Sequence, residues 1–128
     1  MRYLLDTHVL LWAASEPDKI SEPVRKQLED PLNELVFSAA SFWEIAIKNS
    51  LERPDFKVEM WILRRSLLDN GYEELPVTSE HAAFTQMLER HHKDPFDRML
   101  IAQACVEDLT LLTADWQVAQ YPGPIQKI

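Results

Sequence analysis

The chain has 128 residues, of which 46% are hydrophobic and 27% charged, and 13 Lys and Arg against 21 Asp and Glu give a net charge of −8. A chain of this length can bury a full core, so we expect residues 1–128 to form a single domain. The acidic balance argues against a nucleic-acid binder with a broad basic face, but it does not exclude a nuclease whose carboxylates hold divalent cations.

Short apolar runs alternate along the chain with segments of helical spacing. The first half is predicted to contain a strand at 2–5 (RYLL), a helix at 8–14 (HVLLWAA), a strand at 34–37 (ELVF) ended by Ser38, and a helix at 39–51. The second half is predicted to contain a helix at 58–71 ended by Asn70-Gly71, a strand at 72–77, a helix capped by Thr78 or Ser79, a helix that Asp94 caps and Pro95 opens, a strand at 109–113 and a short strand at 124–128.

The predicted strands are short and apolar on both faces, and no hairpin turn dipeptide joins them. Such strands, alternating with helices, are typical of a parallel sheet covered on both sides. The predicted fold class is therefore α/β, a three-layer sandwich with a short, mainly parallel central sheet flanked by helices.

A few residue types narrow the choice of function further. Only Gly71 and Gly123 are glycines, which excludes a glycine-rich phosphate-binding loop. Cys105, the single cysteine, lies in an apolar helical pattern and is predicted to be a core thiol. Asp6 interrupts the only apolar run near the N-terminus, so we expect no membrane span and a cytoplasmic location.

Four acidic residues are predicted to meet at one edge of the sheet. Asp6 directly follows the first strand, and Asp115 follows the fourth in the sequence LLTAD. Glu44 and Asp97 lie near the starts of helices, and helices that follow parallel strands begin at the edge where those strands end. Ligands of open parallel sheets bind at this same edge.

Each acid also has a simpler explanation as a helix cap. Glu44 lies on a helical face with Ala40, Ile47 and Leu51, which is a costly place for a lone charge. Asp94 is expected mainly as a cap, and a supporting role beside the metal ligands is its lesser alternative. The capping alternatives are Asp6 for the helix at 8–14, Glu44 in a capping box with Ser41, Asp97 as a first-turn acid behind Asp94, and Asp115 for a helix at 116–120.

Clustered carboxylates repel one another and stay ionised only when something compensates their charge. Mg²⁺ or Mn²⁺ would do so, because hard divalent cations prefer oxygen ligands. The chemistry that suits such a cluster is metal-assisted attack of water on a phosphodiester.

Four segments carry a family resemblance: LLDTHVLLW at 4–12, SAASFWEIAIK at 38–48, HKDPFDRMLIAQA at 92–104 and LLTAD at 111–115. In order and spacing, along nearly the whole chain, they resemble PIN-domain ribonucleases, and within these the toxins of VapBC-type toxin–antitoxin pairs. The chain departs from the family pattern at 49–57 (NSLERPDFK), where relatives often carry a short glycine-containing turn.

The resemblance implies a metal-dependent endoribonuclease that uses Mg²⁺ or Mn²⁺, acts on RNA, binds a cognate antitoxin protein and forms homodimers. It also implies which residues form the catalytic and metal site, with Thr7 and Thr113 nearby: Asp6, Glu44, Asp97 and Asp115.

Two rival functions are compatible with parts of this pattern. A Mg²⁺-binding phosphoacceptor signalling module would need paired acids after the first strand, an aspartate after the third and a lysine near the fifth. The chain offers the single Asp6 in LLDTH and no acid at the end of ELPVTS. A non-catalytic PIN-like binding domain is the other rival, and the presence of all four acids argues against it.

Other candidates leave alternatives open. The basic patch at 90–93 (RHHK) is either a solvated turn or a phosphate contact, and Arg98 either orients substrate or pairs with an acid. His8 and His81 have no zinc-ligand spacing with His91 and His92.

Aromatic and apolar residues point to packing and partners. Trp12, Trp43, Trp61 and Trp116 are expected to be core or interface anchors rather than base-stacking platforms. The helix at 58–70 carries more apolar residues than one buried stripe requires, which predicts that part of it docks an antitoxin segment or a second copy of the chain.

Overall fold

The computed structural model describes residues 1–90 and 92–128. His91, part of the predicted basic patch, lies outside the described residues. The elements in chain order are β1 (Arg2–Leu5), α1 (Thr7–Ser15), the 3₁₀ helix η1 (Pro17–Lys19), α2 (Glu22–Glu29), β2 (Glu34–Ser38), α3 (Ala39–Ser50), α4 (Met60–Asp69), β3 (Glu73–Leu75), α5 (Ser79–Phe84), the 3₁₀ helix η2 (Thr85–Met87), α6 (Pro95–Glu107), β4 (Thr110–Thr113), α7 (Trp116–Ala119) and β5 (Ile125–Lys127).

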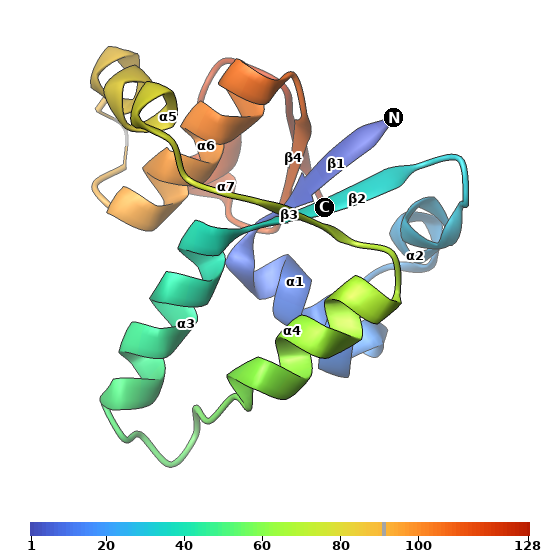
Figure 1. The fold of residues 1–128 in the computed structure, drawn as a ribbon. Helices are drawn as coiled ribbons and strands as arrows, with labels where there is room; N and C mark the ends of the chain where they lie inside the picture. The colour runs from blue at the N-terminus through green and yellow to red at the C-terminus, as the bar shows by residue number, and fades with distance from the viewer. Residues whose placement is uncertain (91) are drawn as a thin grey trace.

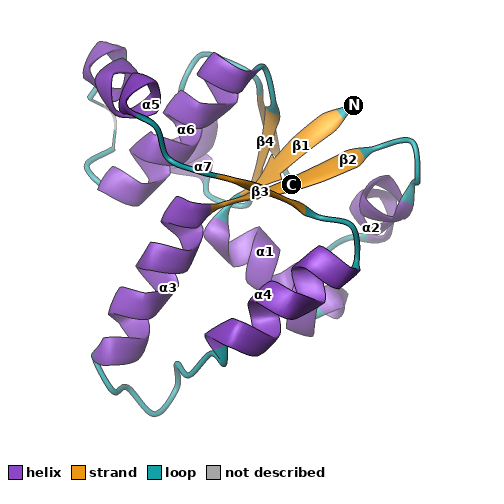
Figure 2. Cartoon of the chain, in the orientation of Figure 1, coloured by secondary structure: helices purple, strands orange, loops and turns teal. Residues whose placement is uncertain are grey.

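The five strands form one sheet in the order β3-β2-β1-β4-β5, and all four strand pairings are parallel. Helices α1, α3 and α4 lie on one side of the sheet, and α6 lies on the other (Figures 1 and 2). The predicted α/β three-layer sandwich with a parallel central sheet is thereby confirmed. No helix within the described residues has the length and apolar composition to cross a lipid bilayer.

Alternation along β1 explains the two sides of the core. Tyr3 and Leu5 point to a cluster with α1, α3 and α4, whereas Leu4 points to a cluster with α6 and α7. All three are buried. Because successive residues of a strand face opposite sides, a short strand without polar residues must be covered by helices on both faces.

Several helix ends form as the sequence predicts. Asp94 accepts a hydrogen bond from the backbone N–H of Asp97, and Pro95 occupies the first turn of α6. Thr78 caps α5. Gly71, with φ of +85°, follows the end of α4 in the backbone conformation that glycine adopts without strain.

The predicted capping box of Ser41 and Glu44 is wrong. Ser38 is both the last residue of β2 and the cap of α3, and its hydroxyl accepts from the N–H of Ala40 at 3.0 Å. The strand therefore runs into the helix without a loop, so Ser41 lies inside the helix, where its hydroxyl accepts from that of Thr7 at 3.0 Å.

Of the four tryptophans, Trp12 packs against the core, and the other three lie outside it. Trp43, Trp61 and Trp116 are each more than 60% exposed, so none of the three contributes to the interior. Cys105 does pack against the core cluster beneath α6 and α7, where burial raises the pKa of its thiol. Helix α2 is an addition that the apolar pattern of the sequence did not predict.

A buried polar chain ties α6 to the end of β2 and to α5. The Gln103 side chain accepts from the Ser38 hydroxyl at 2.6 Å and donates to the carbonyl of Pro76 at 3.3 Å. His81 lies beside it, with its Nε2 at 2.7 Å from Glu107. Gln103, Ser38 and His81 are fully buried, so these bonds replace water that the groups lost on folding.

Replacing Gln103 by leucine should lower the free energy of unfolding by about 2 kcal/mol, because buried groups that bonded to it lose their partner. Gln126→Leu is the matched control: Gln126 bonds to Gln27 in a partly buried pair at 2.9 Å, where water can replace the lost bond. Its expected change is below about 0.5 kcal/mol. Urea unfolding of both variants measures the difference, and equal losses would contradict this role of Gln103.

Candidate metal site at the carboxyl edge of the sheet

Strands β1 and β4 lie side by side at the middle of the sheet, where the chain order changes direction. The backbone N–H of Asp6 donates to the carbonyl of Leu112 at 3.0 Å, so the pairing continues to the ends of both strands. In open parallel sheets, ligands bind outside the carboxyl ends of the strands at such a switch point. Asp6 and the residues after β4 therefore lie where a ligand is expected.

Asp6 caps α1 and has a second role at the same time. Its Oδ1 accepts from the N–H of Val9 at 2.9 Å, and its Oδ2 accepts from the Thr113 hydroxyl at 2.6 Å. Burial raises the pKa of Asp6, and the negative charge of Asp115 adds to the rise, while the two hydrogen bonds oppose it. The capping explanation for Asp6 is thus correct, but it accounts for only one of the two carboxylate oxygens.

Thr113 joins the two aspartates that follow β1 and β4. Its hydroxyl donates to Asp6 and accepts from the backbone N–H of Asp115 at 3.0 Å. Asp115 caps α7, as predicted, through a bond from the N–H of Gln117 to Oδ1 at 2.8 Å. Both aspartates are therefore held at the same edge by one threonine.

Glu44 is buried on α3, with 7% of its surface exposed, although Ile47 and Leu51 on the expected apolar face are exposed. Its Oε2 lies 3.2 Å from the ammonium of Lys48. Its Oε1 is buried and, among the described residues, has no hydrogen-bond partner. A carboxylate oxygen left in this way is a costly feature that a bound cation would compensate.

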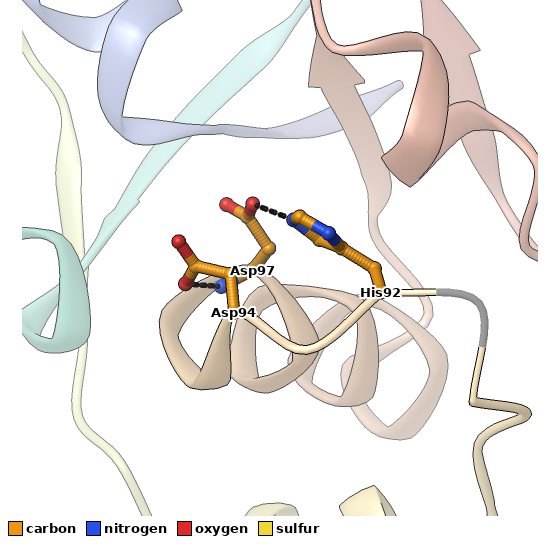
Figure 3. Close-up of side chains that lie close together, drawn as sticks. All are labelled: His92, Asp94 and Asp97. Atoms are coloured by element: carbon orange, nitrogen blue, oxygen red, sulfur yellow. Dashed lines mark hydrogen bonds and ion pairs between the residues drawn. The ribbon is translucent and has the colours of Figure 1, made fainter.

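Asp97 forms its closest contacts within its own segment. Figure 3 shows His92, Asp94 and Asp97 together at the start of α6. The Nε2 of His92 lies 2.7 Å from Oδ2 of Asp97. Burial raises the pKa of Asp97 from 3.8 to about 6, and the charges of Asp94 and Glu44 add to the rise, whereas the bond from His92 lowers it.

The four predicted acids fall into two pairs that influence each other's charge. Asp115 acts on Asp6, and Glu44 acts on Asp97. Within residues 1–90 and 92–128, the ligand atoms close enough to share one cation come from His92, Asp94 and Asp97, within 4.8 Å of one another. The structure thus adds His92 and Asp94 to the neighbourhood of Asp97, while a single site that contains all four acids stays a prediction.

The sequence pattern that could have indicated the group of His92, Asp94 and Asp97 is the spacing H-x-D-x-x-D. The sequence predicts Asp94 mainly as a cap and His92 as part of a basic patch. Asp94 does cap the helix. The ring of His92 bonds to Asp97, a contact that neither alternative for the basic patch, a solvated turn or a phosphate contact, had included. Within the described residues, the guanidinium of Arg98 donates to backbone carbonyls of the preceding segment rather than to an acid, while a role in orienting substrate stays a prediction.

The chain is similar in sequence to a known protein family. The family model described as the PIN domain matches residues 3–124. The chain belongs to the PIN domain family. Among curated proteins, this PIN domain is 27% identical over 122 residues to Ribonuclease VapC22 of Mycobacterium tuberculosis, which covers 94% of the chain and 92% of the relative.

Solved structures share the fold of this PIN domain. A chain in the crystal structure of VapBC2 from Rickettsia felis, bound to a DNA fragment from its promoter, has a TM-score of 0.72 at 15% identity, covering 99% of this chain and 98% of that one. VapBC-1 from nontypeable Haemophilus influenzae gives 0.67 at 17% identity, with the same coverages.

The raised pKa of Asp97 predicts how the stability of the metal-free protein depends on pH. Between pH 3.8 and about 6 the folded state holds this proton more tightly than the unfolded chain, so stability falls as the pH rises through this window. Asp97→Asn removes the ionised carboxylate and should stabilise the protein in chelator at pH 7 by on the order of 2 kcal/mol, with little effect near pH 4. Thermal or urea unfolding at both pH values measures this.

Asp55→Asn is the control, because Asp55 is an exposed aspartate between α3 and α4. It should change stability by less than about 0.5 kcal/mol at either pH. If Asp97 were only a favourable first-turn acid, its replacement would destabilise the protein at pH 7. That result would contradict a raised pKa of the Asp97 carboxyl.

Proposed function

We propose that this PIN domain, residues 1–128, is a metal-dependent endoribonuclease that cleaves RNA phosphodiester bonds as the toxin of a toxin–antitoxin pair. The observation that carries the proposal is the pair of acids at the switch point of the sheet, Asp6 and Asp115, which Thr113 joins. Asp97 and Glu44 support it as a second pair whose charges interact. The similarity to Ribonuclease VapC22 supports RNA as the substrate.

Asp6, Glu44, Asp97 and Asp115 are the residues that we propose to hold Mg²⁺ or Mn²⁺ and to form the catalytic site. Two observations fit a cation: the buried Oε1 of Glu44 lacks a partner among the described residues, and Asp97 carries a raised pKa beside two other acids. When bound, a divalent ion would orient and acidify a water for attack and would place positive charge opposite the phosphate.

The side chains of the chain itself have distinct tasks in this proposal. The Thr113 hydroxyl donates to Asp6 and favours its ionised form, which a ligand carboxylate needs. Its acceptance from the N–H of Asp115 fixes the start of α7 against the same edge. Lys48 neutralises Glu44 in the absence of other cations, with the ammonium 3.2 Å from the carboxylate.

The rival phosphoacceptor module fits less well. Signalling modules of that doubly wound type have the strand order 2-1-3-4-5, whereas the order here is β3-β2-β1-β4-β5. In addition, β3 ends at Leu75 before Pro76, so the third strand brings no acid directly to the edge. A non-catalytic PIN-like domain remains the alternative that the next experiment separates.

We expect RNA cleavage to require Mg²⁺ or Mn²⁺ and to be lost in excess chelator, since the acids alone offer no positive charge to the phosphate. Asp6→Asn, Asp97→Asn and Asp115→Asn should each lower cleavage on the order of a hundredfold or more, whereas Asp55→Asn should cleave normally. Added Mg²⁺ should raise the Tm of the wild type and raise that of Asp97→Asn much less. Undiminished cleavage in chelator would show that the proposed chemistry is wrong.

The proposed antitoxin contact lies on α4. Leu63 and Leu67 are buried, but Trp61 is 80% and Ile62 67% exposed, so the helix has an apolar surface beyond its core stripe. A cleft of about 330 Å³ lies beside Trp61, and its lining consists of Phe37, Ala39, Phe42, Met60, Trp61, Arg64 and Glu74. A protein partner is supported by the fold's likeness to chains of VapBC complexes, while the homodimer and the cytoplasmic location stay predictions.

Trp61→Ala should weaken binding of the cognate antitoxin by about tenfold or more, because a large exposed aromatic side chain is a typical interface anchor. Trp116→Ala is the control, since Trp116 is similarly exposed but lies on α7. Titration of antitoxin, followed by calorimetry, measures both. Equal affinity of the Trp61→Ala variant and the wild type would place the antitoxin elsewhere.

A further inference from the structure

Arg98 binds the loop that precedes its own helix. Its Nη2 donates to the carbonyl of Thr85 at 2.9 Å, and its Nη1 donates to the carbonyl of Glu89 at 2.9 Å. Longer contacts of 3.4 Å reach the carbonyls of Leu88 and His92. One guanidinium thus gathers backbone groups from η2 and from the loop before α6, which a side chain with a single donor nitrogen cannot do.

Tyr121 completes this arrangement from the other end of the chain. It is buried in the core cluster below α6 and α7, and its hydroxyl accepts from Arg98 at 3.1 Å. The same hydroxyl accepts from the N–H of His92 at 2.9 Å and lies 3.2 Å from the carbonyl of His92. The backbone of His92 is therefore fixed on both of its polar groups by a residue of the core.

The His92 ring is held just as firmly. Its side chain is only 15% exposed, and its Nε2 meets Oδ2 of Asp97 at 2.7 Å. A carboxylate oxygen only accepts, so the ring presents Nε2–H as a donor. This bond occupies one oxygen of Asp97 and leaves the other, Oδ1, for a ligand (Figure 3).

We propose that His92 is a positioning residue for Asp97, and that Arg98 and Tyr121 hold His92 in place for this role. The proposal rests on the function proposed above, in which Asp97 is a ligand of the divalent ion. His92 restricts the carboxylate to one rotamer and one face, so that Asp97 needs no reordering when the ion binds. A hydrogen bond to a metal ligand from a residue that does not itself touch the ion typically contributes tenfold to a hundredfold to metal affinity or activity.

Four variants of the full chain test the proposal. His92→Phe keeps a flat ring and removes the donor, His92→Gln keeps an N–H donor, and Tyr121→Phe removes only the hydroxyl that fixes the His92 backbone. Tyr72→Phe is the matched control, because Tyr72 packs near α4 on the opposite side of the sheet. Calorimetry with Mn²⁺ measures affinity without RNA, and cleavage of a structured RNA gives kcat and KM.

His92→Phe should lose about tenfold to a hundredfold in Mn²⁺ affinity and in kcat at limiting Mn²⁺, with the KM for RNA nearly unchanged. His92→Gln should recover most of the affinity, Tyr121→Phe should lose part of it, and Tyr72→Phe should match the wild type. Long-range ¹H–¹⁵N spectra of the metal-free wild type should show the His92 proton on Nε2, and thermal melts identify any variant that does not fold.

Wild-type Mn²⁺ affinity in His92→Phe overturns the proposal. A glutamine variant as weak as the phenylalanine variant also overturns it, because an N–H donor at this position would then fail to restore the Mn²⁺ affinity. If Tyr121→Phe does not fold, the two His92 variants still decide. If the variants follow this order of Mn²⁺ affinities but the wild type cleaves no RNA, the ribonuclease function is contradicted and the role of His92 is retained.

Discussion

The hydrogen bond from the Thr113 hydroxyl to Asp6 joins the two central strands at the point where the sheet reverses its order. It connects residues 107 positions apart in sequence, and both side chains are buried. Burial at this depth raises the pKa of Asp6, and the bonds that it receives from a hydroxyl and from a backbone N–H oppose the rise by favouring the ionised form. The edge of the sheet, the first turn of α1 and the start of α7 all take their positions from this junction.

The parts predictable from sequence are those where strand ends set the geometry. Asp6 and Asp115 follow short apolar runs whose alternation with helices predicts buried parallel strands, and parallel strands of one sheet end at the same edge. The positions of both, and their capping bonds, follow from that rule. The resemblance in LLDTHVLLW and LLTAD leads to the same two residues, so pattern and family agree here.

The less predictable parts depend on how side chains meet across helices. Glu44 was given a capping partner in Ser41 because local spacing cannot reveal that β2 passes into α3 at Ser38 without a loop. Spacing also does not show that His92, in a basic run, bonds to Asp97, or that the guanidinium of Arg98 donates to backbone carbonyls. These contacts depend on tertiary packing, notably on Tyr121, which approaches from after α7.

The direct passage of β2 into α3 has a consequence for how the chain tolerates changes in length. A residue inserted between Ser38 and Ala39 would turn the whole helix by about 100° about its axis and carry Glu44 away from Asp97. The opposite end of α3 can accommodate changes in length. The side chain of Asn49 bonds to the backbone carbonyl and N–H of Val58 at 2.8 and 3.0 Å. The loop between these two residues is largely exposed and includes Glu52 at a φ of +54°. Insertions and deletions among relatives should therefore accumulate after this helix and spare its beginning.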